Sequence, residues 1–535
     1  MKINKFTSLF ATCLLMGLTA CSNDNVSDAD SNNSAKDKDL TGKTSFSITS
    51  EAKTRTSGVY DGSGVDFYWT TDDNIWVNSS SATSPTLTAS SSNNITSTTA
   101  SAKFYFDGTY TAASYPVRYT GKASTSGNTV TIATSQNQDE ANNATQLGTV
   151  GDCGVGTATR KTDGSYKFNL SHEASYITFM PYYSKEELAA SAVVTQINVT
   201  AANGESLAGK FNFSDNGLGT AISSSSSNSV TLTLNGTTPT TGFPIPKAAT
   251  ASKNAAIMVV APGTYSTFKV TYTLYDSVTG TESTISYTYS NINCTAGKNQ
   301  KISTDLGMAT YTSRKADYYM WDAKSNYWDG FETSQPLLNN AANTNYAKSS
   351  ADSRWYNTAF TKNVQTKAIN SCKDQPTFEA LTWYIDGGSP QVDNKTLWVF
   401  ANHLYVGGIW IKKQSKIPGF SSTMSYPSRY PWISGKDIPV SVAISGKPEA
   451  SVRSSYFYLP ALGQYKDGKL IGLGVSGYYW ASTPNPVNNG DRSAGYGKVI
   501  SANCLRFTID ETDMDNVYVR SYYERHVGMQ VQKFE

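Results

Sequence analysis

Charged residues are scarce in this chain of 535 residues, at 16% of the sequence, and the two signs nearly cancel to a formal net charge of +2. No basic run stands out among them, so the sequence gives no sign of nucleic-acid binding. Histidine is scarcer still, with His172, His403 and His526 far apart along the chain. We therefore expect structural histidines rather than a histidine metal site, and we expect no metal ion or other cofactor.

Long apolar runs and catalytic signatures are also missing. After residue 20, no segment approaches the run of about 18 apolar residues that a membrane-spanning helix needs. The sequence contains no GxSxG nucleophile elbow, no HExxH zinc motif and no phosphate-binding loop. Clustered acids such as Asp72 and Asp73 are more typical of turns than of a glycosidase pair. The sequence therefore predicts that this chain is not an enzyme.

Residues 1–20 have the layout of a secretion signal: two lysines, then the apolar stretch Leu9–Leu18, which is too short to span a bilayer, and then small residues. Leu18 to Cys21, Leu-Thr-Ala-Cys, resembles the lipobox of bacterial lipoproteins. That resemblance implies that the chain is cut before Cys21 and that the Cys21 thiol is diacylated, which gives a lipid anchor in the membrane. The alternative is an ordinary signal peptide with a chance cysteine.

The segment after Cys21, residues 21–43, is rich in Ser, Asn and Asp and has almost no large apolar residue, so it is expected to be a flexible tether. Export would place the later cysteines in a compartment that permits disulfides. Four of them lie beyond the tether, and four cysteines allow three pairings. We favour Cys372 with Cys504, and Cys153 with Cys294 is a further candidate pair. Their spacing matches no zinc motif.

Aromatic residues make up 12% of the chain, with 34 Tyr, and they suit pleated surfaces that uncharged polar residues coat. Short alternating or apolar runs bounded by Gly, Asn, Ser and Asp predict strands without intervening helices through the first half. The strands expected there are 44–50, 65–69, 75–77, 166–170, 174–182, 193–199, 229–234, 257–260, 268–274 and 284–289. In the first of these, Phe46 and Ile48 share one face.

Five motifs in the first half occur in a familiar order: TSFSITSEAKTRTSG, FYWTTDDNIWV, YKFNLSHEASYITFMPYY, INVTAANGESLAGKFNF and TAGKNQKISTDLG. Together they resemble the fimbrillins of Bacteroidetes pili over residues 44–308. The resemblance implies a mainly β fold with two transthyretin-like β-sandwich lobes in tandem, whose boundary lies at about 165–195. Ser- and Asn-rich insertions near 78–101 and 221–228, and Cys153 at an expected apolar position, depart from the family pattern.

The fimbrillin resemblance also implies a way of assembling. In that family an outer-membrane lipoprotein precursor is cut after an arginine near its first strand, and a strand of a neighbouring subunit fills the groove that the lost strand leaves. Arg55 is the best matching cleavage site, and Phe46 and Ile48 lie on the strand that would be removed. Arg55 at the end of a strand facing solvent is the alternative. An incoming strand would pair the freed backbone and seat alternate side chains, which is β-strand addition.

The second half, residues 309–535, is rich in tryptophan, and one helix is expected from Pro376 to Ile385, with Phe378, Leu381 and Ile385 on one face and a Gly-Gly pair after it. Short strands are expected at 397–400, 408–411, 456–459, 477–480, 504–509, 517–520 and 527–531. The runs YLPALG, GYYWAST, CLRF and RHVGMQV resemble the "major paralogous domain" of Bacteroidetes and Fibrobacter surface proteins. That resemblance implies an α+β fold of the C-type-lectin type.

The lectin-type fold does not imply sugar binding here, because the calcium-dependent sugar motifs are absent. Trp480 is a candidate for stacking on a ligand, although a core position is the favoured interpretation for so large a side chain. Exposed aromatic residues in segments 414–436 and 481–499 would be better ligand candidates.

The sequence as a whole predicts a fimbrial subunit that reaches the cell surface by way of the outer membrane, with other fimbrial subunits and an unidentified surface ligand as partners. A tip adhesin is favoured, because a whole domain rather than a spare strand follows the fimbrillin-like region. The alternative is a surface lipoprotein that does not polymerise and that binds glycan or protein.

Overall fold

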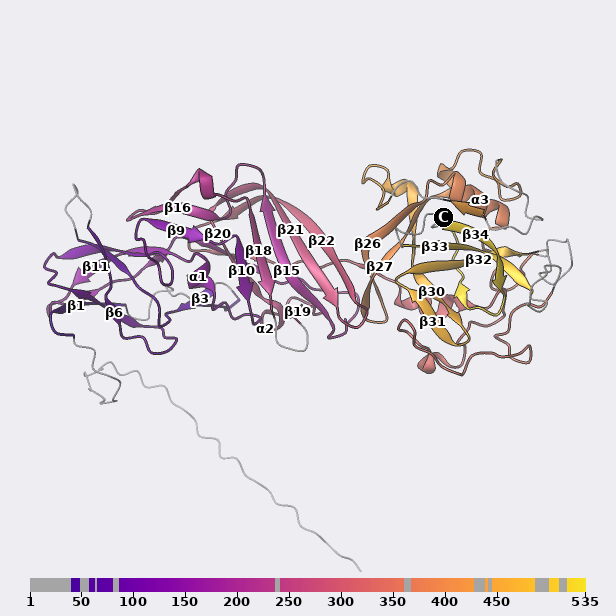
Figure 1. Ribbon diagram of the computed structural model, residues 1–535, viewed down its shortest axis with the longest axis horizontal. Coiled ribbons are helices and arrows are strands. Elements are labelled where there is room, and N and C mark those ends of the chain that lie inside the picture. The colour runs from indigo at the N-terminus through magenta and orange to yellow at the C-terminus, as the bar shows by residue number, and fades with distance from the viewer. Residues whose placement is uncertain are drawn as a thin grey trace, which may run out of the picture. The chain divides into compact units, whose positions relative to one another are not determined.

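The structure is a computed structural model, and it describes residues 40–48, 57–62, 65–79, 86–235, 241–359, 367–427, 438–440, 445–485, 500–509 and 517–535. Their fold is mainly β, which confirms the fold class expected from the sequence (Figure 1). The α-helices among them are α1 (Leu147–Val150), α2 (Ala251–Asn254) and α3 (Phe378–Asp386). No helix of these described segments is long and apolar enough to cross a membrane.

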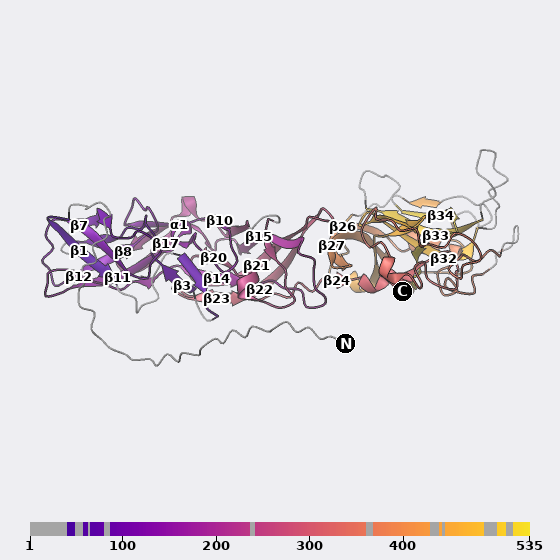
Figure 2. The same cartoon turned by 90° about the horizontal axis from the view of Figure 1, so that it is seen from below.

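The first large sheet gathers strands from the N-terminal part of the described chain, and Figure 2 shows several of them side by side. Its strand order is β5 (Leu87–Ala89), β4 (Trp76–Asn78), β8 (Ser114–Tyr119), β11 (Gly154–Arg160), β12 (Tyr166–Lys167), β1 (Lys43–Ile48), β7 (Ala102–Asp107) and β6 (Ser92–Asn93), with β13 (Ser171–His172) pairing β11. The strand nearest the N-terminus, β1, is therefore an interior strand of this sheet.

The second region is built around a sheet of long antiparallel strands, which Figure 1 shows lying next to one another. Its order is β10 (Ser135–Gln138), β18 (Ser229–Leu234), β15 (Ala192–Ala201), β21 (Gly263–Asp276) and β22 (Thr281–Cys294), with β19 (Phe243–Pro244) pairing β15. A second layer has the order β20 (Ala256–Val260), β14 (Ser175–Phe179) and β23 (Asn299–Ile302). Two smaller sheets join β17 (Gly217–Ala221), β16 (Gly209–Ser214) and β9 (Thr129–Ile132), and β2 (Ser57–Tyr60) with β3 (Val65–Tyr68).

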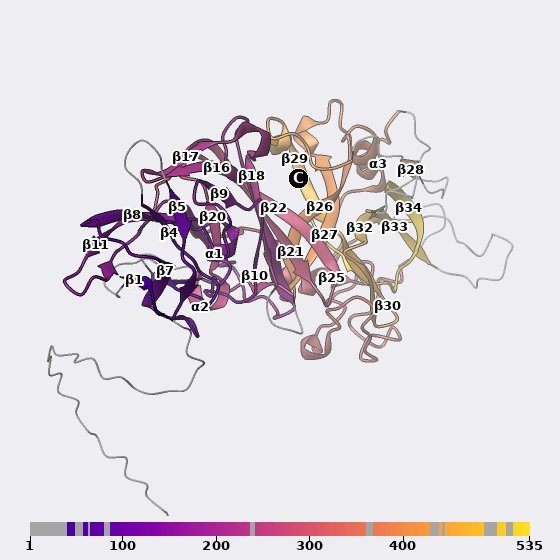
Figure 3. The same cartoon turned by 60° about the vertical axis from the view of Figure 1, so that its left-hand side comes forward.

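The C-terminal region holds two sheets and α3 (Figure 3). One sheet has the order β24 (Ala309–Thr310), β26 (Gln391–Phe400), β27 (His403–Lys412) and β29 (Tyr456–Pro460). The other has the order β25 (Tyr318–Tyr319), β35 (Met529–Gln530), β32 (Ser476–Pro484), β33 (Ser501–Thr508), β34 (Val517–Glu524) and β28 (Ile438–Val440), with β30 (Leu462–Lys466) pairing β31 (Lys469–Leu473) and β32.

Helix α3 confirms the one helix expected from the sequence. Thr377 caps it, because its hydroxyl accepts a hydrogen bond from the Ala380 N–H. Phe378, Leu381 and Ile385 are each about 1% exposed and pack with strands of the C-terminal sheets. The helix is buried on its other faces as well, so it lies inside the domain rather than over one side of it.

Two hydrophobic cores serve the first half of the chain. The first-lobe core contains Phe46, Trp69, Phe104, Tyr119 and Tyr166, and it ends in sequence at Leu170. The second-lobe core begins again at Ala174, but it also takes Tyr60, Val65 and Phe67 from much earlier in the chain. The second-lobe core also includes buried residues between Val130 and Cys153, so the two cores interleave along the chain as far as Leu170. The lobe boundary at about 165–195 stays a prediction. The transthyretin-like and lectin-like descriptions, and the domain limits at 308 and 309, stay predictions.

Two of the three histidines lie in buried contacts with aspartates, as structural histidines do. His172 Nδ1 lies 2.7 Å from Asp152 Oδ1, and the Tyr176 hydroxyl donates to the same carboxylate. His403 Nδ1 lies 3.0 Å from Asp276 Oδ2, where hairpin β26–β27 meets the end of β21. Leu404 belongs to the second-lobe core, so this hairpin packs against the second lobe.

Candidate functional site

The strand that the sequence singled out, β1, is half-buried over its first three residues and buried over its last three. Phe46 is 0% exposed and Ile48 is 2% exposed, while Thr44 and Ser45 remain half-buried. Ser47 is also buried, and its hydroxyl donates a hydrogen bond to the Tyr166 carbonyl. Phe46 and Ile48 belong to the same hydrophobic cluster. That β1 is a removable strand stays a prediction.

β1 is paired on both of its edges. It runs antiparallel to β7 in an unbroken register that extends from Lys43 opposite Asp107 to Ile48 opposite Ala102. On the other edge it runs parallel to the short strand β12, with Phe46 opposite Tyr166. A backbone hydrogen bond of 3.0 Å from the Phe168 N–H to the Ser47 carbonyl extends that edge. The strand therefore closes the gap between two parts of the sheet that do not pair with each other.

An aromatic cage surrounds the Phe46 ring. The ring is stacked on Tyr166, with centroids 4.6 Å apart and an interplanar angle of 9°. It meets Phe106 and Tyr110 edge to face, at centroid distances of 4.9 and 5.4 Å. Tyr115 lies 6.5 Å away at the border of the cage. Aromatic pairs in these geometries stabilise a core beyond their buried area, so Phe46 is the anchor of the strand.

Two hydroxyl groups of the aromatic cage have raised pKa values. Burial raises the pKa of Tyr166, with a smaller contribution from Tyr115. Burial likewise raises the pKa of Tyr110. The Tyr166 hydroxyl donates to the Ala112 carbonyl at 2.7 Å. The part of the first-lobe core that surrounds Phe46 is therefore aromatic and largely apolar.

Polar contacts hold the start of β1 at the surface of the sheet. The Lys43 ammonium lies 2.6 Å from the Asp107 carboxylate and donates to the Ser91 hydroxyl at 2.9 Å. The Thr44 hydroxyl donates to the Gly108 carbonyl at 2.8 Å. Asp107 is largely exposed, so this ion pair contributes little stability, about 1 kcal/mol or less. These polar contacts fix the register of β1 against β7, whereas most of the stability of its attachment comes from the burial of Phe46 and Ile48.

β1 and the next described strand serve different cores. Phe46 and Ile48 belong to the first-lobe core, whereas Tyr60 of β2 belongs to the second-lobe core. β2 pairs only with β3 and makes no ladder with β1 among the described strands. The expected cleavage site, Arg55, belongs to the intervening residues 49–56, which lie outside the described residues.

The other predicted site residues are distributed as follows. Cys21, the signal 1–20 and most of the tether 21–43 lie outside the described residues. Trp480 is 0% exposed, and its indole N–H donates to the Tyr319 carbonyl at 2.8 Å. Trp480 is therefore a core residue, which is the interpretation favoured from the sequence. The alternative prediction that Trp480 stacks on a ligand is wrong, because its ring has no exposed surface.

The candidate disulfides require a correction. Cys153, Cys294 and Cys372 are free thiols in this structure, and all four cysteines are buried. Cys372 and Cys504 do share one hydrophobic cluster, but the Cys372 sulfur instead accepts the Asp322 N–H at 3.2 Å. Burial raises the pKa of Cys372 to about 12 and that of Cys294 to about 11, and it raises the pKa of Cys153 well above its ordinary value. These thiols behave as small core residues.

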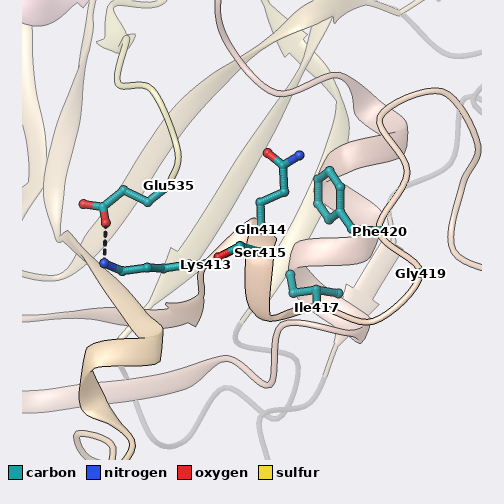
Figure 4. Close-up of a pocket in the computed structure, with 7 residues that line it drawn as sticks. All are labelled: Lys413, Gln414, Ser415, Ile417, Gly419, Phe420 and Glu535. Atoms are coloured by element: carbon teal, nitrogen blue, oxygen red, sulfur yellow. Dashed lines mark ion pairs between the residues drawn. The ribbon is translucent and has the colours of Figure 1, made fainter.

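A second candidate site is an open hollow of about 650 Å³ in the C-terminal region (Figure 4). Its lining consists of Lys413, Gln414, Ser415, Ile417, Gly419, Phe420 and Glu535. Lys413 Nζ and Glu535 Oε2 form an ion pair at 2.9 Å on one side, and the half-buried Phe420 ring lies on the other. Its lining residues other than Lys413 and Glu535 lie in segment 414–436, where exposed aromatic residues would be better ligand candidates than Trp480. In the described segments, no cluster of His, Cys, Asp and Glu could hold a metal ion.

Sequence reasoning missed most of the residues that surround Phe46. Tyr166 was placed in a strand, but no spacing connects it with a residue 120 positions earlier. Strand β7, with Phe104 and Phe106 facing the core, was not predicted, although its alternating Ala-Lys-Phe-Tyr-Phe-Asp sequence carries the signal. It follows directly after a Ser- and Asn-rich insertion, where turns and loops were expected.

No family model matches this chain, and no curated protein matches it. Among solved structures it is similar to a candidate cell adhesion protein from Bacteroides uniformis, with 13% identity over 49% of this chain and 94% of that chain, at a TM-score of 0.28. A candidate cell adhesion protein from Bacteroides eggerthii is 13% identical over 49% and 87%, at a TM-score of 0.25. A fimbrial protein from Bacteroides ovatus is 12% identical over 53% of each chain, at a TM-score of 0.22. TM-scores at this level do not establish a shared fold.

Proposed function

We propose that this chain is a non-catalytic fimbrial subunit in which β1 is a removable strand, and that a strand from a neighbouring subunit replaces it during assembly. One observation carries the proposal. β1 is the only described strand before residue 57, and yet it is an interior strand of the first sheet with both edges paired. Excision of the residues before position 56 would remove one central strand and leave the other described strands intact.

The gap left by β1 has the features that β-strand addition requires. The edge of β7 from Ala102 to Asp107 would present unpaired backbone groups, and so would the shorter edge of β12. Beneath them lies the aromatic cage that Phe46 now fills. An incoming strand with an aromatic residue in the place of Phe46 and an aliphatic residue two positions later satisfies both the backbone and the core.

The proposal for a tip position rests on the C-terminal region. Strand β35 pairs with both β25 and β32 inside the C-terminal sheet, so these residues already have partners in their own domain. Val527 and Met529 are buried there, at about 1% and 0% exposure. We propose that the subunit accepts a strand through its first lobe and presents the C-terminal region outward as an adhesin.

Export belongs to the same proposal. The lipobox-like segment ending at Cys21 supports an outer-membrane precursor held by a lipid, which is released into the fimbrium when the chain is cut after Arg55. Both features concern residues outside the described part of the chain, and the support for them is the sequence alone. The proposed partners are therefore other fimbrial subunits, the membrane by way of the lipid, and a surface ligand of unknown identity.

The N-terminus of the protein in isolated surface fibres tests the proposal. We expect peptide sequencing to find a chain that begins at Thr56, and the Arg55→Ala variant to remain in the membrane fraction and out of the fibres. Lys53→Ala is the matched control, because it removes a neighbouring positive charge and should leave assembly unchanged. Fibres that contain the uncut chain, with β1 still present, would overturn the proposal.

The hollow at Lys413, Phe420 and Glu535 favours a second candidate function, which is ligand binding by a surface lipoprotein that does not polymerise. Its aromatic ring, amide, hydroxyl and ion pair suit a small polar ligand with one apolar face, such as a sugar. Saccharide titrations followed by NMR test this function. Saccharide-induced shifts of the Ser415 and Gly419 amide signals that the Phe420→Ala variant abolishes would support it.

A further inference from the structure

The longest strand at a sheet edge points to a second interaction surface, separate from the β1 site. β22 runs from Thr281 to Cys294 and is the terminal strand of the second-lobe sheet, where it pairs only with β21 (Figure 1). Within the described part of the chain, the segment Thr284–Ser290 makes no backbone hydrogen bond other than those to β21. Its outer edge therefore presents a row of unpaired N–H and C=O groups.

This edge lacks the usual features that prevent strand pairing. Exposed edges are normally protected by charged residues, proline or bulges. The segment Thr284–Ser290 has the sequence Thr-Ile-Ser-Tyr-Thr-Tyr-Ser, which contains no charged residue and no proline. Glu282 lies before it, and Asn291, which has a φ of 56°, interrupts the regular strand after it. The unprotected stretch is thus bounded at both ends.

The core-facing side chains of the segment Thr284–Ser290 are incompletely covered. Phe268, Val270 and Tyr272 of β21 are each 0% exposed. Their cross-strand neighbours on β22 are Tyr289, Tyr287 and Ile285, which face the same core and remain only half-buried.

Hydrogen bonds hold the two tyrosines of β22 inward. The Tyr287 hydroxyl donates to the Leu306 carbonyl at 2.7 Å, and the Tyr289 hydroxyl lies 3.0 Å from the Thr304 hydroxyl. Their exposed flanks therefore lie at the open edge, where one more strand would cover them.

We propose that this edge is covered by the same edge of a second copy of the chain, in a two-fold symmetric antiparallel pairing of β22 centred on Tyr287. The segment is nearly palindromic in residue type, which is the basis for choosing a second copy. With Tyr287 opposite Tyr287, Ile285 lies opposite Tyr289 of the second copy, and both pairs face the core side. Aromatic pairs and pairs of an aromatic with a β-branched residue are favourable across strands.

The outer face of the same register is also self-complementary. Ser286 lies opposite Thr288 of the second copy, and Thr284 lies opposite Ser290, so the face is made of hydroxyl pairs that can hydrogen-bond. On this face the nearest charge is Lys269 of β21, opposite Thr288. The two Lys269 residues stay three strand spacings apart, about 14 Å. That is beyond the Debye length of about 8 Å at physiological salt, so they repel little.

The mass of the purified full-length chain in solution tests this pairing. We expect sedimentation velocity to show a monomer that becomes a dimer as the concentration rises. The variant Ser286→Lys with Thr288→Lys places lysines opposite each other across the two-fold axis and should remain a monomer. The variant Thr264→Lys with Thr267→Lys adds the same charge at exposed positions of β21 and should dimerise normally. Circular dichroism and the thermal midpoint verify that both variants are folded.

Three results would overturn the inference. The first is a wild-type chain that stays monomeric at every concentration, which would leave the edge to a strand of another protein. The second is a dimer that survives in the Ser286→Lys, Thr288→Lys variant, because its interface would then lie elsewhere. The third is loss of the dimer in both variants, which would show an effect of charge alone. None of these results depends on cleavage at Arg55, so this test is independent of the proposed function.

Discussion

Replacement of Phe46 by alanine is the most direct test of how β1 is held. The ring is 0% exposed and contacts Tyr166, Phe106 and Tyr110, so the substitution removes a buried aromatic group and leaves a cavity in the aromatic cage. Core Phe→Ala changes cost about 3–5 kcal/mol. All backbone pairs with β7 remain available in the variant, so the loss isolates the contribution of one side chain.

The Phe46→Ala substitution should favour detachment of β1 before it favours unfolding of the whole chain. If the loss falls mainly on the attachment of β1, about 4 kcal/mol raises the population in which the strand is detached by roughly a thousandfold, because about 1.4 kcal/mol corresponds to a factor of ten. Hydrogen exchange measured by mass spectrometry should then show faster exchange in β1 and along Ala102–Asp107 of β7. Exchange in β15 and β21, which surround the second-lobe core, should be unchanged.

Ser45→Ala is the matched control, because Ser45 lies on the same strand next to Phe46, is half-buried and has no hydrogen-bonded side-chain partner among the described contacts. It should change the free energy of unfolding by less than about 0.5 kcal/mol. A Phe46→Ala variant that loses less than about 1 kcal/mol in urea unfolding, with exchange along β7 unaltered, would refute the reasoning. β1 would then contribute little to the first lobe.

Two further predictions concern the buried polar groups and the thiols. Burial of the Asp276 carboxyl raises its pKa, but hydrogen bonds from His403 and from the Leu404 N–H outweigh burial and hold the pKa below its usual value. The contact then stabilises the folded chain above the ordinary aspartate pKa of about 3.9, and this contribution is lost as the pH falls through the lower folded value. Urea unfolding from pH 6 to pH 2 should show that loss, and the Asp276→Asn variant should lack it while being about 1–3 kcal/mol less stable at pH 6. The thiols of Cys153, Cys294 and Cys372 should resist alkylation in the folded chain and react after denaturation without a reductant, as peptide mass spectrometry would show; recovery of a Cys372–Cys504 peptide pair would contradict the structure.

Most of the long strands could be predicted from the sequence, because alternation and β-branched residues are local signals. The strand expected at 229–234 coincides with β18, and that expected at 193–199 lies within β15. The strands at 268–274 and 284–289 were located but predicted too short, since β21 and β22 continue through polar residues at both ends. At the end of a sheet, where one face of a strand meets solvent, the alternation of apolar and polar side chains stops, although the backbone pairing continues.

The site could be predicted only in part, because its two halves are far apart in sequence. Phe46 was identified from the alternation around it, while the residues that contact it come from β7, β12 and the turn at Tyr110. No local pattern reports that β12 and β1 are parallel neighbours. The disulfide prediction failed for a similar reason. Cys372 and Cys504 share one hydrophobic cluster, but proximity in a core does not by itself place two sulfurs in bonding geometry.

The contacts of β1 are compatible with the proposal that this well-packed strand is replaced during assembly. Burial of Phe46 and Ile48 contributes about 1.5–3 kcal/mol each. The backbone hydrogen bonds add about 0.5–1.5 kcal/mol apiece, which roughly offsets the ordering of six residues at about 1–2 kcal/mol each. What remains is about 3–6 kcal/mol, so at about 4 kcal/mol β1 of the uncut chain is detached roughly one thousandth of the time. A strand that is part of the chain stays bound at that energy, because it loses no translational freedom when it pairs. Under the proposed assembly, a severed strand would also have to regain about 4 kcal/mol or more of lost translational and rotational freedom, so cleavage would be enough to open the groove to a better-matched strand.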